Sequence, residues 1–354
     1  MSRHHSYDTN IRVAVSGRAA RSCVPGSLAG LTSTALLLAM LTSQVCATEA
    51  YDLAFSTFIG GTDWEHARDV VTDAQGNVYI CGGTASRDFP TTVGAYDRTF
   101  NFGDTSGQEC DAFICRFSPN GQMIWSTYLG GPGYDRAYGI EVDGRGYVYV
   151  AGRAGRGFPT TAGAFQPTFQ GYNGGGYGGF QNAFVAKLSA DGSTLVWASY
   201  VGVASLCRDI AIDATGVYLP LGFPDKGTLP PSDWFSNAFQ KTPNGSMDCG
   251  AIKVSGDGAT VLWATWLGGS GQDQNAASIR VDSNGYVYLG GSTFSTDFPT
   301  TPGAHDRTYA GGADFFVARL TPDGNDLVYG TYLGGPGNEW ISTHNLAVDN
   351  QGNA

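Results

Sequence analysis

Ser126–Gly131 reads STYLGG, and close copies of this stretch return along the chain. The other copies are STFIGG at 56–61, ASYVGV at 198–203, ATWLGG at 264–269 and GTYLGG at 330–335. Their first residues are 70, 72, 66 and 66 positions apart. A motif that recurs at a nearly fixed interval is typical of one structural unit used repeatedly. Most residues that recur with the motif are therefore expected to stabilise the fold of the unit, and not to take part in a chemical reaction.

Each unit contains four short segments in which apolar residues alternate with small or polar ones, the period of half-buried β-strands. In the unit that follows residue 131, the first segment ends in IEVD at 140–143, the second is YVYV at 147–150 and the third is 183–188. The fourth ends in the next copy of the signature. The link DGRG at 143–146 opens with Asp and closes with Gly, as tight hairpins do. Four antiparallel strands per unit predict an all-β fold, a β-propeller built from four-stranded blades, with a β-sandwich array as the alternative.

A second motif, DFPTTxGA, lies between the second and third strands at 88–95 and 297–304, and without its Asp at 158–164. Together with YLGG and IxVDxxGxVYV, it makes residues 54–354 resemble the bacterial β-propeller repeat family SBBP. The third repeat, about 204–269, departs from the pattern because PPSDW at 230–234 replaces the FPTT core. The resemblance implies secreted or cell-surface bacterial proteins, often large and multidomain, and it implies no single activity.

The repeats do not complete a ring. After an outer strand at 54–59 come four complete repeats and then NLAVD at 345–349, and the sequence stops inside a hairpin turn at 351–354. Propellers commonly close by sharing one blade between the two ends of the chain. We therefore expect a truncated fragment of a longer protein with roughly six to eight blades.

The N-terminal segment differs from the repeats. Residues 1–47 carry four Arg against one Asp, followed by an apolar stretch at 28–41 and by VCA at 45–47. This order predicts a secretory signal peptide over 1–47 and the propeller repeats over 48–354, hence a bacterial protein that is secreted or held at the cell surface. A retained N-terminal anchor is the alternative. A lipid anchor on Cys46 is disfavoured because Val45 is bulky.

The charge of the chain limits its partners. The net charge is −11, and removal of four Arg and one Asp with the signal would make it −14. Such a surface repels nucleic acid and anionic lipid, so we expect neither nucleic-acid binding nor stable membrane insertion after signal cleavage. Downstream domains of the same chain are potential partners.

Five cysteines follow the signal, an odd number with no CxxC spacing, so they predict no metal framework. Cys81, Cys115 and Cys249 stand where other repeats have Ala, which indicates small buried residues. The sequence leaves undecided whether Cys115 forms a disulfide with Cys110 or with Cys81. It also leaves the role of Cys207 undecided.

The long connections between second and third strands are the expected place for binding, because loops on a rigid scaffold commonly carry function. Their aromatic side chains could stack on sugars, and Trp234, Tyr172 and Tyr177 are the candidates that do not recur. For the recurring aromatics, such as Phe158, packing of each loop onto its own blade is the preferred interpretation.

A second candidate set is acidic. Counting four residues past the second Gly of each signature gives Glu65, Asp135, Asp273 and Glu339, with Cys207 in the third repeat. These side chains could line the mouth of a central channel and bind a cationic ligand or, weakly, Ca²⁺. A turn cap that recurs with the repeat is the preferred interpretation. No cofactor and no firm metal site are predicted.

Catalysis finds little support, since GxSxG and HExxH are absent and no catalytic residue is predicted. The sequence therefore favours a non-catalytic binding scaffold for an extracellular glycan or protein. The alternative is a polysaccharide-active propeller enzyme, a glycosidase or lyase, that uses carboxylates at the channel mouth. A purely structural spacer is the third interpretation.

Overall fold

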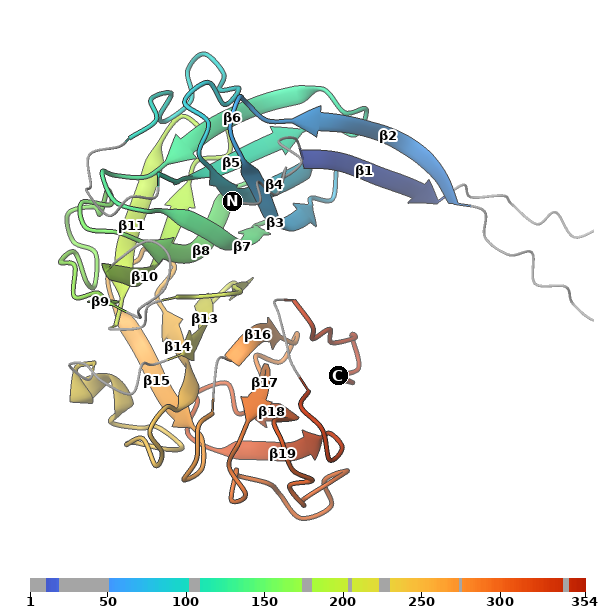
Figure 1. Cartoon of the computed structure of the whole chain (residues 1–354), viewed down its shortest axis with the longest axis vertical. Coiled ribbons are helices and arrows are strands. Elements are labelled where there is room, and N and C mark those ends of the chain that lie inside the picture. Colours follow the sequence, from blue (N-terminus) through green and yellow to red (C-terminus); the bar gives the residue numbers. More distant parts are fainter. Residues whose placement is uncertain are drawn as a thin grey trace, which may run out of the picture. The chain divides into compact units, whose positions relative to one another are not determined.

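The computed structural model describes residues 11–18, 51–101, 109–173, 180–202, 206–222, 230–273, 276–339 and 344–354. The chain divides into two compact units, one of residues 12–58 and one that contains residues 59–354. In the smaller unit, β1 (Ile11–Arg18) and β2 (Tyr51–Ile59) form a two-stranded sheet (Figure 1). β1 falls within the segment predicted to be a signal peptide, and the signal stays a prediction.

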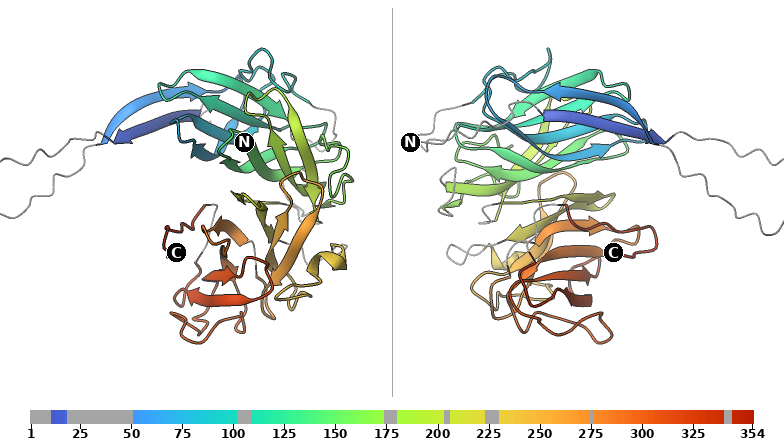
Figure 2. Two further views of the ribbon diagram at one scale, coloured as in Figure 1. Left: turned by 180° about the vertical axis from the view of Figure 1, so that it is seen from behind. Right: turned by 45° about the vertical axis from the view of Figure 1, so that its right-hand side comes forward.

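The larger unit contains four antiparallel sheets, which we number blades 1 to 4 in chain order. Both views in Figure 2 show each blade as a separate twisted sheet. Blade 1 is β3 (Glu65–Thr72), β4 (Val78–Thr84), β5 (Asp111–Phe117) and β6 (Met123–Leu129). Blade 2 is β7 (Arg136–Val142), β8 (Val148–Ala154), β10 (Phe180–Leu188) and β11 (Leu195–Val201), with the short β9 (Tyr172–Asn173) paired to β10. Blade 3 is β12 (Ala211–Asp213), β13 (Gly216–Gly222), β14 (Cys249–Val254) and β15 (Val261–Leu267), and blade 4 is β16 (Ala276–Val281), β17 (Val287–Thr293), β18 (Asp314–Leu320) and β19 (Leu327–Leu333).

The predicted all-β architecture of four-stranded blades is thereby confirmed, together with the hairpin chemistry. In blade 1 the carboxylate of Asp73 accepts the backbone N–H groups of Gln75 (3.0 Å) and Asn77 (2.9 Å). Gly76 closes the turn at φ 79°, a conformation that favours glycine. The Asp-x-x-Gly spacing therefore fixes the register of β3 and β4.

Neighbouring blades share hydrophobic cores. One buried cluster joins blades 1 and 2, another joins blades 2 and 3, and a third joins blades 3 and 4. The first strand of a blade also contacts the first strand of the next, β3 with β7 and β12 with β16, so these first strands are the innermost. Residues on them from several blades can therefore meet.

At the outer edge, a tryptophan of the fourth strand joins each blade to the next. Trp125 Nε1 donates to the carbonyl of Ala190 (3.0 Å), and Trp197 Nε1 donates to the carbonyl of Gly256 (3.0 Å). Trp263 does the same to Pro322 (3.1 Å). The recurring tryptophans are thus interface residues.

The long connections between second and third strands run along the outer strand of their own blade. In blade 2, Thr161 N donates to Ala198 O (3.0 Å) and Tyr200 N donates to Gln166 O (3.1 Å). Both bonds recur in blades 1 and 4, and the second recurs in blade 3 as Trp266 N to Gln240 O (3.1 Å). These connections cover the outer edge of the sheet. An uncovered edge would present unpaired N–H and C=O groups, which invite pairing with other chains and aggregation. The described part of these connections thus packs onto its own blade, as the sequence favoured for the recurring FPTT motif, and ligand binding by the connections stays a prediction.

The five described cysteines, Cys81, Cys110, Cys115, Cys207 and Cys249, are buried and free, so neither disulfide left open by the sequence is formed. The burial of Cys81, Cys115 and Cys249 is what the sequence predicted for small apolar residues at these positions. Among the described residues, no helix is long and apolar enough to cross a membrane.

Candidate functional site: an arginine group around Tyr138

One repeat position on the innermost strands gathers polar side chains from several blades. Each occupant lies two residues before the apolar residue Val70, Ile140, Ile210, Ile279 or Leu346; the occupants are Arg68, Tyr138, Arg208, Ala277 and His344. The variation at this position shows that the blade itself does not require any one side chain there.

Three arginines surround the ring of Tyr138. The guanidinium carbon of Arg68 lies 4.9 Å from the ring centroid, that of Arg136 lies 5.5 Å away and that of Arg153 lies 5.6 Å away. Arg208, from blade 3, also interacts electrostatically with Tyr138. We call Arg68, Arg136, Arg153 and Arg208 the arginine group.

Arg136 and Arg153 stand directly opposite each other in the β7–β8 ladder. Like charges at such a pair destabilise a sheet. Both guanidinium groups donate to the hydroxyl of Tyr134, at 3.3 Å and 3.2 Å. The repeat does not demand Arg153, because Gly83 and Ser292 take its place in blades 1 and 4.

No acidic side chain among the described residues forms an ion pair with the arginine group. The Nε atom of each of the four is buried without a hydrogen-bond partner among those residues. Arg136 is only 5% exposed. Burial lowers the pKa of Arg68 and of Arg208, and the neighbouring Arg136 lowers that of Arg68 further. An acidic protein thus concentrates four unpaired cations at one place.

His66 responds to the same positive field. Its Nδ1 accepts from Arg136 Nη2, which requires a neutral ring. Burial, then the charges of Arg136 and Arg68, lower its pKa to about 4. His66 therefore stays neutral at neutral pH and adds no charge to the group.

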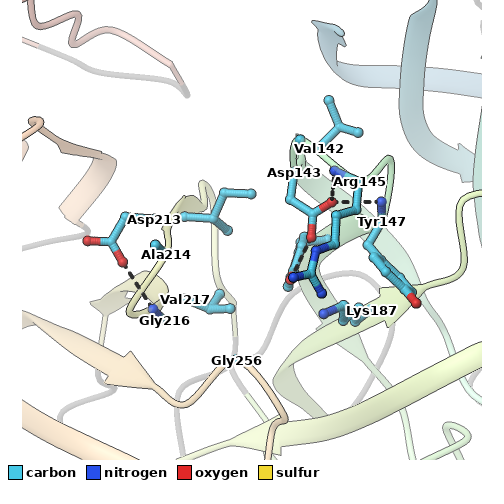
Figure 3. Close-up of a pocket in the computed structure, with 13 residues that line it drawn as sticks. Val142, Asp143, Arg145, Tyr147, Lys187, Asp213, Ala214, Gly216, Val217 and Gly256 are labelled. Atoms are coloured by element: carbon cyan, nitrogen blue, oxygen red, sulfur yellow. Dashed lines mark hydrogen bonds between the residues drawn. The ribbon is translucent and has the colours of Figure 1, made fainter.

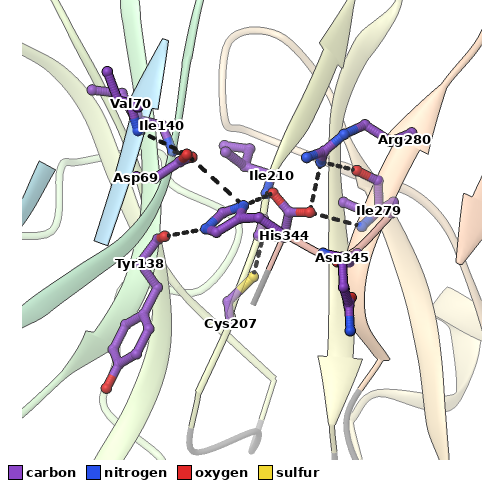
Figure 4. Close-up of polar contacts among 12 residues, drawn as sticks. Asp69, Val70, Tyr138, Ile140, Cys207, Ile210, Ile279, Arg280, His344 and Asn345 are labelled. Atoms are coloured by element: carbon purple, nitrogen blue, oxygen red, sulfur yellow. Dashed lines mark hydrogen bonds and ion pairs between the residues drawn. The ribbon is translucent and has the colours of Figure 1, made fainter. Parts of the chain in front are cut away.

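Further along the innermost strands lies an acidic cluster with a histidine (Figure 4). Asp209 Oδ2 accepts from Arg280 Nη1 (2.6 Å), and Asp209 Oδ1 lies 3.2 Å from His344 Nδ1. His344 Nδ1 is 3.9 Å from Asp69 Oδ1, and its Nε2 is 3.0 Å from the carbonyl oxygen of Tyr138. Burial raises the pKa of nearby Glu141 to about 7, and Arg280 offsets part of that rise. The cluster joins side chains from blades 1, 3 and 4 to the segment at 344–354.

Two of these carboxylates also connect successive blades. Asp69 Oδ2 accepts from Ile140 N (2.9 Å), and Asp209 Oδ2 accepts from Ile279 N (3.0 Å). At the same repeat position, Ser278 Oγ accepts from Asn345 N (2.9 Å). A side chain of one blade thus satisfies an edge N–H of the next innermost strand, which has no neighbouring strand to pair with.

The structure places the four predicted carboxylates just after the Gly-Gly signature, three of them at or before the start of a blade's first strand, and gives them backbone donors. The second Gly of the signature donates to each: Gly61 N to Glu65 (3.3 Å), Gly131 N to Asp135 (2.7 Å), Gly269 N to Asp273 (2.7 Å) and Gly335 N to Glu339 (3.3 Å). These contacts are those of a recurring turn cap. The predicted binding of Ca²⁺ or a cationic ligand by them stays a prediction.

The three predicted aromatic ligand residues are not brought together by the described contacts. Trp234, in the 3₁₀ turn η2 (Ser232–Phe235), is half-buried and packs edge-on against Phe165 of the preceding blade at 5.9 Å. Tyr172 lies in β9, and Tyr177 lies outside the described residues. Next to Trp234, Phe235 is buried and stacks on Trp266, so it fills the place of the FPTT phenylalanine in the divergent repeat.

A groove of about 670 Å³ opens between the tight hairpins of blades 2 and 3 (Figure 3). It is lined by Asp143, Arg145, Lys187 and Asp213 among others. The two Asp side chains accept from backbone N–H groups of their own hairpins, and Lys187 lies over the rings of Tyr147 and Tyr149. The polar groups of this groove are therefore largely used by the turns, unlike the arginine group.

Sequence reasoning missed the arginine group because its members are scattered over 68–208 and follow no motif. The signal that could have found them was departure from the repeat, since Arg136 stands where blade 1 has His66, and Arg153 stands where blades 1 and 4 have Gly83 and Ser292. Searching the repeats for what does not recur would have found this site.

The fold and these sites define a β-propeller repeat protein. Residues 124–159 and 262–299 match the model of the SBBP family, described as a beta-propeller repeat. The resemblance predicted from the YLGG and FPTT motifs is thus confirmed for these two segments.

A curated relative is the regulatory protein FlaEY of Caulobacter vibrioides, 24% identical over 307 residues. The match covers 84% of this chain and 30% of the relative, so the chain spans under a third of that protein. Among solved structures, a variant of Synechocystis apocarotenoid oxygenase matches at TM-score 0.28 and 12% identity, over 77% of this chain and 71% of the other. The cobalt-substituted form of the Synechocystis enzyme matches at TM-score 0.26 and 13% identity, over 76% and 70%.

Proposed function

We propose that this β-propeller is a non-catalytic binding scaffold, exported to the cell surface or the medium, that binds an acidic glycan through the arginine group. The observation that supports this is the gathering of four guanidinium groups without a carboxylate partner among the described residues. The signal-like segment at 1–47 supports export.

The shape of the group favours a compact anion. Three of the guanidinium groups lie within 4.9–5.6 Å of one phenol ring, so they surround a single place rather than line a long surface. Arginine presents paired N–H donors that match carboxylate and sulfate oxygens. One uronate or sulfate group of a polysaccharide fits this arrangement better than an extended acidic peptide.

Arg153→Gln is expected to weaken binding of an acidic polysaccharide about 10- to 100-fold, because charge-assisted hydrogen bonds contribute roughly 1.5–3 kcal/mol. Gly and Ser at the equivalent positions of blades 1 and 4 indicate that the fold tolerates the change. Titration calorimetry with alginate, heparin and neutral dextran measures the effect. Binding should also weaken as salt rises.

Arg145→Gln is the matched control, since it removes the same charge from an exposed hairpin of the same blade. It should leave the affinity within about twofold, a change well below 1.4 kcal/mol. No binding of alginate or heparin by the native chain would overturn the proposal. Loss of binding with Lys187→Gln but not with Arg153→Gln would move the site to the hairpin groove, and binding of acidic peptides alone would replace the glycan by a protein.

A polysaccharide-active enzyme is the second candidate, and Glu141 is the observation that favours it. A carboxyl whose pKa is about 7 is suited to act as a general acid at neutral pH. Release of new reducing ends or unsaturated products from the bound polysaccharide, abolished by Glu141→Gln, would establish the enzyme. Retention of the polysaccharide without products supports the scaffold.

A further inference from the structure

The Asp69–Asp209–His344 cluster has the composition and spacing of a metal site. One carboxylate oxygen of each Asp and one nitrogen of the His lie within 4.8 Å of one another. The three residues come from blade 1, blade 3 and the segment at 344–354, far apart in the sequence. The cluster borders the arginine group, because Asp69 and Asp209 directly follow Arg68 and Arg208, but it shares no residue with that group or with the turn-capping carboxylates.

The hydrogen bonding of His344 leaves its other nitrogen facing negative charge. A carbonyl oxygen can only accept, so His344 Nε2 carries the proton that it donates to Tyr138 O. In the neutral ring, Nδ1 then presents a lone pair toward Asp209 Oδ1 at 3.2 Å and Asp69 Oδ1 at 3.9 Å. This buried Nδ1 has no hydrogen-bond partner among the described residues. Two carboxylates facing Nδ1 call for a cation at this place, either a proton on Nδ1 or a metal ion.

The surroundings orient the three groups as metal ligands commonly are oriented. Metal-binding histidines usually donate the opposite ring N–H to a carbonyl or carboxylate, and their carboxylate neighbours are held by further hydrogen bonds. Here Tyr138 O receives that N–H, Val70 N and Ile140 N hold Asp69, and Ile210 N and Arg280 hold Asp209.

The spacing selects the kind of cation. Zinc binds N and O ligands at about 2.0–2.2 Å in a tetrahedron, which places ligand atoms roughly 3.3 Å apart. The 3.2 Å between His344 Nδ1 and Asp209 Oδ1 matches that value, whereas the 3.9 Å to Asp69 Oδ1 is longer. Calcium takes about six to eight oxygen ligands and magnesium about six, so both suit a site with an imidazole nitrogen less well.

We propose that Asp69, Asp209 and His344 form a zinc-class site that ties blades 1 and 3 to the segment at 344–354, with one coordination position left open. The open position follows from three protein ligands at a tetrahedral ion. The site would hold the innermost strands in place independently of any glycan at the arginine group.

The test uses the full chain, stripped with EDTA and titrated with zinc, calcium and magnesium salts. We expect one zinc bound through this cluster, a rise in melting temperature with zinc alone, and a loss of affinity of at least about 100-fold in His344→Ala. His305→Ala, an exposed histidine in the loop of blade 4, is the matched control and should keep the affinity.

Cobalt provides a readout that does not depend on the variant. The native chain loaded with Co²⁺ should show the intense visible absorption of a tetrahedral ion with nitrogen and oxygen ligands. Equal zinc affinity in the native chain and His344→Ala, or an octahedral cobalt spectrum, would overturn the proposal. In that case His344 Nδ1 carries a proton, and the imidazolium is the cation that faces Asp69 and Asp209.

Discussion

Asp111→Asn is expected to make the protein more stable than the native chain at pH 8. Asp111 is fully buried at the start of β5, and burial raises its pKa to about 8. Its Oδ2 accepts from Asn101 N (2.7 Å), whereas its Oδ1 has no hydrogen-bond partner among the described residues. At the same position of blade 2, the amide of Asn182 donates to Val201 O (3.2 Å) and Gly202 O (2.9 Å). An asparagine side chain at this position always carries an N–H hydrogen-bond donor, whereas Asp111 can donate only when its carboxyl group is protonated.

The direction of the pH dependence follows from the raised pKa. The folded chain holds the Asp111 proton more tightly than the unfolded chain, so its contribution to stability is complete below the unfolded pKa near 4. That contribution is lost as pH rises toward about 8. At about 1.4 kcal/mol per pKa unit, the loss is on the order of 5 kcal/mol. The difference in unfolding free energy between Asp111→Asn and the native chain should therefore grow in favour of the variant from pH 5 to pH 8.

Asp248→Asn is the control for this prediction. Asp248 has the same place in blade 3, yet its oxygens accept from Asn244 N (2.6 Å) and Gly245 N (3.2 Å). Burial raises the pKa of Asp248 too, but an amide there would set an N–H against one of its two backbone donors, so Asp248→Asn should gain less stability at pH 8 than Asp111→Asn, measured by urea unfolding. If Asp111→Asn is less stable than the native chain at pH 8, Asp111 is ionised and balanced by a cation.

Phe158→Ala is expected to lower the free energy of unfolding by about 3–5 kcal/mol, the usual cost of emptying a buried aromatic site. Phe158 is 4% exposed and packs against Phe184 at 4.4 Å and Tyr200 at 6.0 Å between ring centroids. Its backbone N–H also donates to the Tyr200 hydroxyl (3.0 Å). The FPTT motif thus ties its loop to its own blade.

Trp234→Ala separates packing from ligand binding. Trp234 is half-buried and has one described ring neighbour, so its loss should cost roughly 1–2 kcal/mol, less than that of Phe158. Thermal melting and glycan titration of both variants measure stability and affinity. A Phe158→Ala protein that keeps its stability but no longer binds glycan would show that the repeated aromatics contact ligand.

Much of the fold follows from the sequence because each local signal is repeated. The Asp-x-x-Gly hairpin at 73–76, the alternation along 112–117 and the Gly-Gly signature all predict the same four-stranded blade, and the sheets confirm it. One element of the third repeat could not be predicted from the sequence. Phe235 reaches the core from a 3₁₀ turn, and no FPTT motif marks that turn.

The candidate site was much less accessible to sequence reasoning. Arg68, Arg136 and Arg208 lie on three different blades, and only the packing of innermost strands brings them around Tyr138. Residues that recur, such as Asp135, attract notice in a repeat, yet the fold uses them for backbone hydrogen bonds. The His344 cluster depends in the same way on distant segments.

The contacts between blades have a consequence for how such a protein can change its length. Asp69 and Asp209 reach forward to the N–H of the following blade, and Trp125 and Trp197 reach forward to its turn carbonyls. The tryptophan contact recurs at three successive junctions, although Gly139 gives blade 2 no side chain for the innermost contact. A whole unit duplicated or deleted within the array therefore meets a matching donor and acceptor at the outer edge of both of its borders. Unequal recombination between repeats can alter the blade number without new mutations at this outer contact. The arginine group would not survive such an exchange, since its four members are particular to three blades.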